Sequence, residues 1–272
     1  MEMFRNAMEI FILLDRSNCR KCGEKTCMAF AGAVLRGQKK LEHCPKIDAA
    51  TLARYSMVQG QSTAVDDDPE ASLVVLRQQV REIDLTETAR RVGGEFVNGR
   101  LIVRILGKDF SVDTEGNLSS FIHIIPWVSA PFLTYVLHCQ GTPVTGEWIS
   151  FREIKGGRER YPLFQKRGEE AMKRVADTWP DLFSDIVSLF NGRRVEAHFD
   201  SDISVVLPVL PLVPLLICYW READGIDSSL NIFFDQSINA NLDVGAAYML
   251  ATGLTQMFEK LALRHGYTIP QK

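Results

Sequence analysis

Four cysteines lie close together near the start of this chain, and they restrict the fold more than any other feature of the sequence. They are Cys19, Cys22, Cys27 and Cys44, separated by two, four and sixteen residues. A segment this short has few apolar residues for a core of its own, so small modules of this kind are commonly held together by disulfides or by metal. The spacing therefore predicts a compact cysteine-rich module at this end of the chain.

The expected compartment decides between disulfides and metal. The opening residues MEMFRNAMEIFILLD carry acids inside the apolar stretch, and no small-residue cleavage site follows them, so they do not match a secretory signal. We therefore expect a cytoplasmic protein. Thiols stay reduced in the cytosol, and clustered cysteines there more often bind metal than pair with one another.

A membrane span is not expected either. The most apolar run, Ile203–Trp220, has about the length of a transmembrane helix. It contains Pro208, Pro211 and Pro214, each of which lacks a backbone donor and disfavours a continuous helix. We interpret the run as buried strands with an extended break.

The cysteine pattern favours an iron–sulfur cluster. Such clusters are held by cysteine thiolates, typically four, and here three close thiols can clamp one side while Cys44 closes the other. Cys27 opens a predicted helix, whose free N–H groups favour negative charge. Gly23 lets the backbone approach the cluster, and Pro45 turns the chain away from it.

Two other metal sites remain open at this point. Structural zinc also takes four cysteines, usually as two close pairs, and His43 could assist Cys44 in a second pair. A 2Fe–2S cluster is the other alternative, since the plant-type spacing uses the same numbers in the reverse order. The spacing favours a 4Fe–4S cluster over both.

Charge is distributed unevenly along the chain. The formal net charge is −3, which gives no electrostatic case for binding nucleic acid. Residues 1–60 carry ten Lys or Arg and six Asp or Glu, a charge of +4, so the rest of the chain stands at −7. An anionic cluster with four thiolates would account for the basic segment.

Hydrophobic periodicity predicts two domains joined by a linker. Helices are expected over residues 4–15, 27–36 and 49–57, which gives a helical cluster-binding module over residues 1–58. Residues 59–70 lack large apolar side chains and end in acids and a proline, which is typical of a linker. Residues 71–272 form the second domain.

The second domain mixes helices and strands without regular alternation. Helices are predicted over residues 71–83, 85–92, 131–139, 169–178, 181–190 and 241–264, and strands over 95–97, 100–106, 109–113, 120–125, 195–199, 203–207, 212–219 and 230–235. Asn98-Gly99 predicts a hairpin, and so does the acidic turn Arg221–Ser228. This order favours an α+β fold with a mainly antiparallel sheet and packed helices.

No catalytic motif stands out in the second domain, and the sequence leaves open whether the chain is an enzyme. It contains no dinucleotide-binding glycine pattern after a strand, no phosphate-binding lysine loop and no nucleophile elbow. Several residues could carry chemistry but are better explained by packing or solvation; these are His123, His138, His198, His265, Cys139, Cys218, Glu222, Asp224 and Asp227. If this domain contacts a ligand or partner, we expect the contact at Gly146–Gly157, which holds Trp148 and Arg152 between glycines.

The segment Asn6–Pro45 resembles a known cluster domain. Its pattern C-x2-C-G-x3-C-x16-C-P, with alanines after the third cysteine, is similar to the 4Fe–4S domain of the large subunit of corrinoid/iron–sulfur proteins. It also resembles the domain in the B subunit of Rnf-type electron-transport complexes. The resemblance covers about the first fifth of the chain. It implies that the four cysteines are the cluster ligands and that the protein transfers electrons at low potential in anaerobic metabolism.

The remainder of the chain, about Val74–Leu263, resembles a domain-of-unknown-function family that often follows such cluster domains in anaerobes. The stretches that carry this resemblance are GEWISFREIKGG, ICYWREADGIDSSLNIFFD and NLDVGAAYMLATGLTQ. The family implies no activity. No D-x-H-x-x-G pattern for binding cobalamin is present, so any corrinoid is expected on a partner protein.

Two functions from different classes follow. In the first, the cluster passes single electrons to a redox partner or activates it reductively, and a corrinoid protein is one such partner. In the second, the chain is an interaction protein without redox turnover, and the cluster only stabilises a module with a small core. A structural cluster has no need of reversible reduction, so the reduction potential distinguishes the two.

Overall fold

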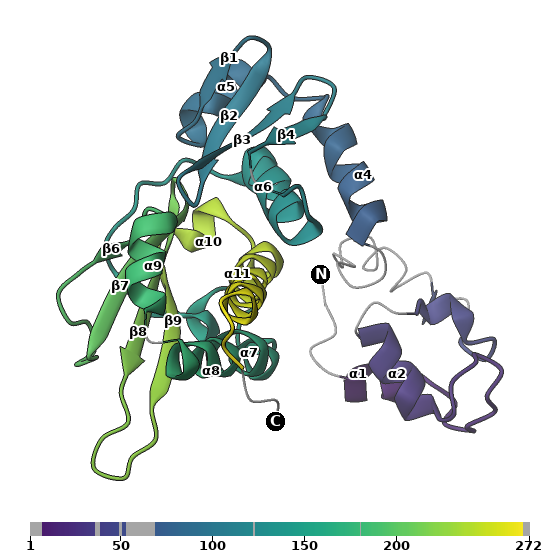
Figure 1. Ribbon diagram of the computed structural model, residues 1–272. Coiled ribbons are helices and arrows are strands. Elements are labelled where there is room, and N and C mark those ends of the chain that lie inside the picture. Colours follow the sequence, from purple (N-terminus) through teal and green to yellow (C-terminus); the bar gives the residue numbers. More distant parts are fainter. Residues whose placement is uncertain are drawn as a thin grey trace. The chain divides into compact units, whose positions relative to one another are not determined.

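The computed structural model describes residues 7–35, 39–48, 51–52, 69–121, 123–179 and 181–268. The chain divides into two compact units, Met1–Pro69 and Glu70–Lys272, which are described separately. Figure 1 shows their helices and strands coloured along the sequence. Of the predicted linker over residues 59–70, residues 59–68 lie outside the described part, and Pro69 and Glu70 belong to the helix that follows.

Short helices build the first unit, and none of its described residues lies in a strand. Helix α1 spans Ala7–Ile12, helix α2 spans Cys27–Leu35 and a 3₁₀ turn spans Leu41–His43. Helices α1 and α2 pack against each other (Figure 1). Buried side chains from these helices and from the segments after them form a small core made of Ile10, Leu14, Phe30, Ala31, Val34, Leu41 and Ile47 together with Cys27 and Cys44.

The predicted third helix, residues 49–57, lies outside the described residues except for Thr51 and Leu52, which are helical. Asp48 caps this turn, because its carboxylate accepts hydrogen bonds from the N–H of Thr51 at 2.8 Å and from its hydroxyl at 2.6 Å.

Two antiparallel sheets and a set of helices form the second unit, which confirms the α+β prediction. The first sheet has the order β1-β2-β3-β4, with β1 at Glu95–Val97, β2 at Arg100–Ile105, β3 at Lys108–Asp113 and β4 at Leu118–Ser120. The tight turn after β1 is Asn98-Gly99, where both residues have positive φ, as the sequence predicted.

The second sheet has the order β5-β9-β8-β7-β6. Its strands are β5 at Trp148–Ser150, β6 at Arg193–Arg194, β7 at Ile203–Leu210, β8 at Val213–Trp220 and β9 at Ser229–Asp235. The apolar run Ile203–Trp220 is thus a β-hairpin, with Pro208 opposite Pro214 and a register shift beside them. The predicted hairpin around the acidic turn is confirmed by the pairing of β8 with β9.

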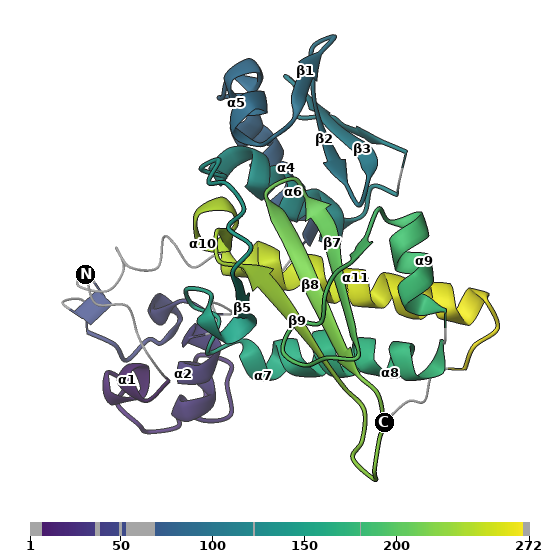
Figure 2. The same ribbon diagram turned by 90° about the vertical axis from the view of Figure 1, so that its left-hand side faces the viewer.

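Helices cover one face of the second sheet. The helices of the second unit are α4 at Pro69–Val80, α5 at Leu85–Arg91, α6 at Pro126–His138, α7 at Tyr161–Phe164, α8 at Glu170–Thr178, α9 at Leu182–Leu189, α10 at Ile238–Asn241 and α11 at Val244–Arg264, with a 3₁₀ turn at Phe151–Glu153 and a π-helical segment at Gln165–Glu169. Helix α8 packs on β9 and α9 packs on β7. In Figure 2 the strands β7, β8 and β9 lie in front of α11. Among the residues that the structure describes, no helix is both long and apolar enough to cross a membrane.

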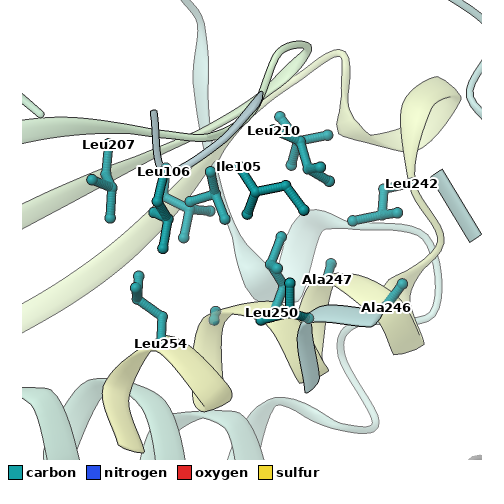
Figure 3. Close-up of a cluster of buried hydrophobic side chains, with 14 of the residues drawn as sticks. Ile105, Leu106, Leu207, Leu210, Leu242, Ala246, Ala247, Leu250 and Leu254 are labelled. Atoms are coloured by element: carbon teal, nitrogen blue, oxygen red, sulfur yellow. The ribbon is translucent and has the colours of Figure 1, made fainter. Parts of the chain in front are cut away.

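One buried core joins the two sheets of the second unit. Ile105 ends β2 and Leu106 begins the turn to β3, and both side chains are buried. Figure 3 shows them between Leu207 and Leu210 of the second sheet and Leu250 of α11. Leu106 adopts a φ of +52° and Gly107 a φ of +75°, which closes the two-residue turn tightly enough for its tip to enter the core.

Two predicted strands are wrong in whole or in large part. Residues 195–199 were expected to form a strand, but β6 contains only Arg193 and Arg194, and Phe199 and Asp200 adopt positive φ values of 53° and 56° that leave the strand conformation. The strand expected over 120–125 ends at Ser120. Its extended pattern is explained by Ile125, which precedes Pro126 and caps α6 in an extended conformation.

Candidate metal centre

The described backbone brings the four predicted ligand cysteines to the same part of the first unit. Helix α2 begins at Cys27, the loop before it carries Cys19 and Cys22, and Cys44 directly follows the 3₁₀ turn Leu41–His43. All four are free thiols. Burial raises the pKa of Cys44, and the neighbouring Cys22, Cys19 and Cys27 raise it further, so the Cys44 thiol is within electrostatic range of the other three.

Exposure differs among the four thiols. Cys27 is 7% exposed and Cys44 is 6% exposed, and both belong to the apolar core of the unit. Cys19 and Cys22 are only half-buried. One side of the set therefore faces the core, and the other side lies near the surface.

The loop before α2 has an unusual backbone. Three of its residues other than glycine have positive φ: Arg16 at 59°, Asn18 at 49° and Arg20 at 60°. They alternate with Ser17 and Cys19, which are outside this region. Where left-handed residues alternate with right-handed ones, successive N–H groups form a concave site that binds anions and iron–sulfur clusters, and the left-handed positions of that pattern are present here. Arg is uncommon in this conformation and carries a strain of about 1–3 kcal/mol there, whereas Asn adopts it more readily.

Asn18 and Cys27 bind each other in both directions. The N–H of Asn18 donates to the Sγ of Cys27 at 3.3 Å, and the N–H of Cys27 donates to the Oδ1 of Asn18 at 2.7 Å. A hydrogen bond from the N–H of Lys21 lowers the pKa of Cys19, against a smaller opposing effect of burial. Both sulfurs thus accept backbone hydrogen bonds, and hydrogen bonds to the sulfurs are one of the factors that tune an iron–sulfur cluster.

Two lysines that follow α2 in the chain contact the loop before α2. Lys39 donates to the carbonyl oxygen of Cys22 at 2.6 Å and pairs with Glu24 at 3.2 Å. Lys46 pairs with Asp15 at 2.5 Å. These contacts connect the segment around Cys44 to the loop with Cys19 and Cys22, so that the two ligand segments stay together.

These residues fit an iron–sulfur cluster. Four reduced thiols, N–H groups directed at two of the sulfurs and surrounding cations suit an anionic cluster held by thiolates. In the described part of the chain, no three His, Cys, Asp or Glu side chains meet at a point that a single metal ion could occupy. An iron–sulfur cluster does not need its ligands to meet at one point, because each thiolate binds a different iron.

Comparison with known protein families identifies the family to which the second unit belongs. A family model described as "Domain of unknown function (DUF3786)" matches residues 84–257, more than half of the chain. The chain belongs to the DUF3786 family. This description assigns no activity to the domain.

A second family model, described as "Putative Fe-S cluster", matches residues 14–46 of this DUF3786 protein. The matched region contains Cys19, Cys22, Cys27 and Cys44. The comparison supports an iron–sulfur protein, with the cluster region at the N-terminal side of the DUF3786 domain.

Curated relatives match only part of the chain. Gamma subunits of the acetyl-CoA decarbonylase/synthase complex match at 43% identity in Methanopyrus kandleri, 45% in Methanocaldococcus jannaschii and 42% in Methanothermobacter thermautotrophicus. These matches cover 18%, 15% and 32% of this chain, and 11%, 8% and 27% of the relatives. The chain thus spans a minor part of the length of these relatives. No solved structure matches the chain.

The four remaining histidines are explained by their surroundings. His123 and His138 are exposed, and His123 lies before α6 rather than in the strand expected there. His198 packs edge-on to Trp148 at 6.3 Å. His265 stacks on Trp179 at 5.3 Å. Each has a packing or surface role of the kind that the sequence favoured.

The two cysteines of the DUF3786 domain lie separately in its interior. Cys139 is 1% exposed and contacts the amide oxygen of Asn241 at 3.4 Å. Cys218 is fully buried and contacts the hydroxyl of Ser204 at 3.6 Å. Burial raises the pKa of both thiols, which keeps them protonated and unreactive.

The segment Gly146–Gly157, where we expected a ligand or partner contact, serves largely to build the fold. Phe151 is fully buried and stacks on Phe164 at 4.1 Å. Arg152 lies over the ring of Tyr161 at 4.5 Å, and the carboxylate of Glu153 accepts from the N–H and hydroxyl of Ser150. A ligand or partner contact in this segment therefore stays a prediction, and it would involve only the exposed part of the segment.

The acidic turn after β8 is exposed, as expected. It borders a surface hollow of about 420 Å³ lined by Asp202, Trp220, Arg221, Ala223, Asp224, Ile226, Asp227, Ser229 and Asn231. Asp224 and Gly225 have positive φ and reverse the chain at the tip. The turn is therefore a solvated hairpin end.

Sequence reasoning missed three groups that matter for the local chemistry. Asn18 supports the backbone around Cys27, and only its place before a cysteine could have signalled this role. The pairing of Lys39 and Lys46 with distant acids could not be read from the chain. Glu169 is 3% exposed and accepts from the hydroxyl of Tyr161 at 2.9 Å and the N–H of Ile232 at 3.2 Å. Burial raises its pKa more than these bonds lower it, and nothing in the sequence marks it.

Proposed function

We propose that this DUF3786 protein carries a 4Fe–4S cluster on Cys19, Cys22, Cys27 and Cys44, and that it passes single electrons at low potential to a partner protein in anaerobic metabolism. The observation that carries the proposal is the first unit itself. Its four reduced thiols lie in the region matched by the iron–sulfur family model, and backbone N–H groups point at two of them.

The bound cluster would supply reversible one-electron chemistry, and the chain's own residues would set its conditions. Hydrogen bonds to the sulfurs and burial on the side of Cys27 and Cys44 are the factors by which a protein tunes a cluster's potential. The half-buried Cys19 and Cys22 leave one side near the surface, where a partner could come close.

We further propose that the partner is a corrinoid protein or another protein that needs reductive activation. Support comes from the resemblance of the cysteine segment to the large subunit of corrinoid/iron–sulfur proteins, and from the three gamma subunits of the acetyl-CoA decarbonylase/synthase complex among its relatives. The reduced cluster would donate an electron to the cobalt of such a partner.

The test is an anaerobic redox titration of the purified protein followed by electron paramagnetic resonance. A reversible one-electron reduction at low potential, with a spin-half signal, is the expected result. A cluster that cannot be reduced reversibly, or a protein that binds zinc instead, would refute electron transfer and favour the structural role.

A further inference from the structure

The loop Asp15–Thr26 carries positive charge that its own acids do not balance. Its two acids, Asp15 and Glu24, are each paired with a lysine from later in the first unit, Lys46 and Lys39. The four cations of the loop are Arg16, Arg20, Lys21 and Lys25, and all four are exposed. Within the described ranges, no ion pair links Arg20, Lys21 or Lys25 to an acid. The loop therefore presents free positive charge to solvent.

This charge lies beside the more exposed side of the thiol set. Cys19 and Cys22 belong to the same loop and are half-buried, whereas Cys27 and Cys44 face the core. Arg20 and Lys21 separate the two half-buried cysteines in the sequence. Electron transfer weakens steeply with distance, so a partner gains most by approaching the cluster from this loop.

The cluster's own charge does not cancel the loop's. A four-iron cluster with four thiolates carries roughly two negative charges. Four loop cations would therefore leave a net charge of about +2 around the exposed thiols when the cluster is oxidised, and about +1 after it has taken up one electron. Such a local field attracts anionic surfaces and speeds their association, most strongly at low salt.

We propose that the loop Asp15–Thr26 is the surface on which the redox partner docks, and that the partner presents an acidic patch there. This inference rests on the proposed electron-transfer function and adds the chemistry of the partner's surface. Arg20, Lys21 and Lys25 steer the partner, while Cys19 and Cys22 provide the short route to the cluster. Their role is in association, since the thiols alone hold the cluster.

Small redox probes of opposite charge test this directly. The dithionite-reduced protein, freed of excess reductant, is mixed in a stopped-flow instrument with hexacyanoferrate(III), an anion, or hexaamminecobalt(III), a cation. Rates are compared at about 0.01 M and 1 M salt, where the screening length is about 30 Å and 3 Å. We expect added salt to slow the anion at least tenfold and not to slow the cation.

Variants locate the effect on the loop. The triple variant Arg20→Glu, Lys21→Glu, Lys25→Glu should slow the anionic probe at least tenfold at low salt and speed the cationic one. The matched control is Lys108→Glu, Arg158→Glu, Lys166→Glu, three exposed cations of the second unit with the same change in net charge. Equal effects of the two triple variants would overturn the assignment to this loop. If the loop variant loses iron, the corresponding Gln variant replaces it, with a smaller but same-signed effect expected.

A binding measurement makes the test independent of electron transfer. Hexacyanocobaltate(III) resembles the anionic oxidant but accepts no electrons, and its binding to the unreduced protein is followed by isothermal titration calorimetry. We expect binding at low salt that the loop variant weakens at least tenfold and the control variant does not. Undiminished binding to the loop variant would overturn the proposal. A cluster that resists reduction would refute the proposed function and leave this readout intact. Self-association in analytical ultracentrifugation that the loop variant abolishes would overturn the assignment to a separate partner.

Discussion

Asn18 offers a quantitative test of how the loop supports Cys27. Replacing Asn18 with Ala removes the acceptor of the Cys27 N–H, now bonded at 2.7 Å, and leaves that group without a partner beside a side chain that is 7% exposed. An unsatisfied buried donor costs about 1–3 kcal/mol. Ala must also hold the φ of +49°, which costs about 1 kcal/mol more than Asn. We expect Asn18→Ala to destabilise the loop by about 2–4 kcal/mol.

Asn18→Gly separates the two contributions, because Gly tolerates positive φ but also lacks the acceptor. We expect it to cost about 1 kcal/mol less than Ala. The assay is anaerobic transfer of iron to a coloured chelator. If iron leaves through local opening of the loop, about 2 kcal/mol accelerates its loss roughly 30-fold. Asn18→Asp keeps an acceptor and serves as the control. Iron loss from Asn18→Ala at the wild-type rate would refute the reasoning.

Three further predictions concern the DUF3786 domain. Gly253→Ala should lower its unfolding free energy by about 1–3 kcal/mol and its Tm by several degrees, because a Cβ at this position would overlap the Trp127 ring; an unchanged Tm in calorimetry would contradict this. Glu169 has a raised pKa in the folded state, so the unfolding free energy of the wild-type protein should fall as pH rises from about 4.3 through that pKa. Glu169→Gln should remove this pH dependence in urea unfolding measured at several pH values. An unchanged pH dependence would refute the assignment of the effect to Glu169. Burial alone would raise the pKa of Asp235, but hydrogen bonds from Thr145, Ser237 and Gly146 outweigh it and hold the pKa below its usual range. Its stabilisation should therefore be present above about pH 3.9 and lost as pH falls toward the folded pKa, and Asp235→Asn should cost about 1–3 kcal/mol at pH 7; a neutral substitution in the same unfolding experiment would contradict this.

Local signals predicted much of the fold because they depend on neighbouring residues. Asn98-Gly99 specifies its turn through positive φ at both positions, and β1, which precedes the turn, has its predicted bounds. Asp243 accepts hydrogen bonds from the N–H groups of Gly245 and Ala246 and caps the start of α11. The helix therefore begins at Val244, slightly after the predicted start at residue 241.

Features that depend on distant residues were not predictable. Strand β5 is three residues long and forms only by pairing with β9, more than eighty residues away. The π-helical segment places Glu169 against the edge of β9 where β5 has ended, so that its carboxylate accepts the N–H of Ile232. Neither partner is visible in the local sequence.

In the candidate site, too, local features were predictable from the sequence and features that depend on distant residues were not. Spacing alone singled out the four cysteines of the candidate site, and their role as cluster ligands stays a prediction. The three positive φ values in the loop before α2 were not predicted, since Arg seldom adopts this conformation without support from elsewhere. The ion pairs of Lys39 with Glu24 and of Lys46 with Asp15, which join this loop to a later segment, could not be predicted from local sequence either.

Counting iron and acid-labile sulfide in the anaerobically purified protein tests the central claim most directly. We predict about four irons and four sulfides per chain. Cys27→Ala should lose the intact four-iron cluster, while Cys139→Ala, which removes a buried thiol of the second unit, should retain it. Four irons and four sulfides in Cys27→Ala would contradict the ligand set, and zinc without sulfide in the wild-type protein would contradict the cluster itself.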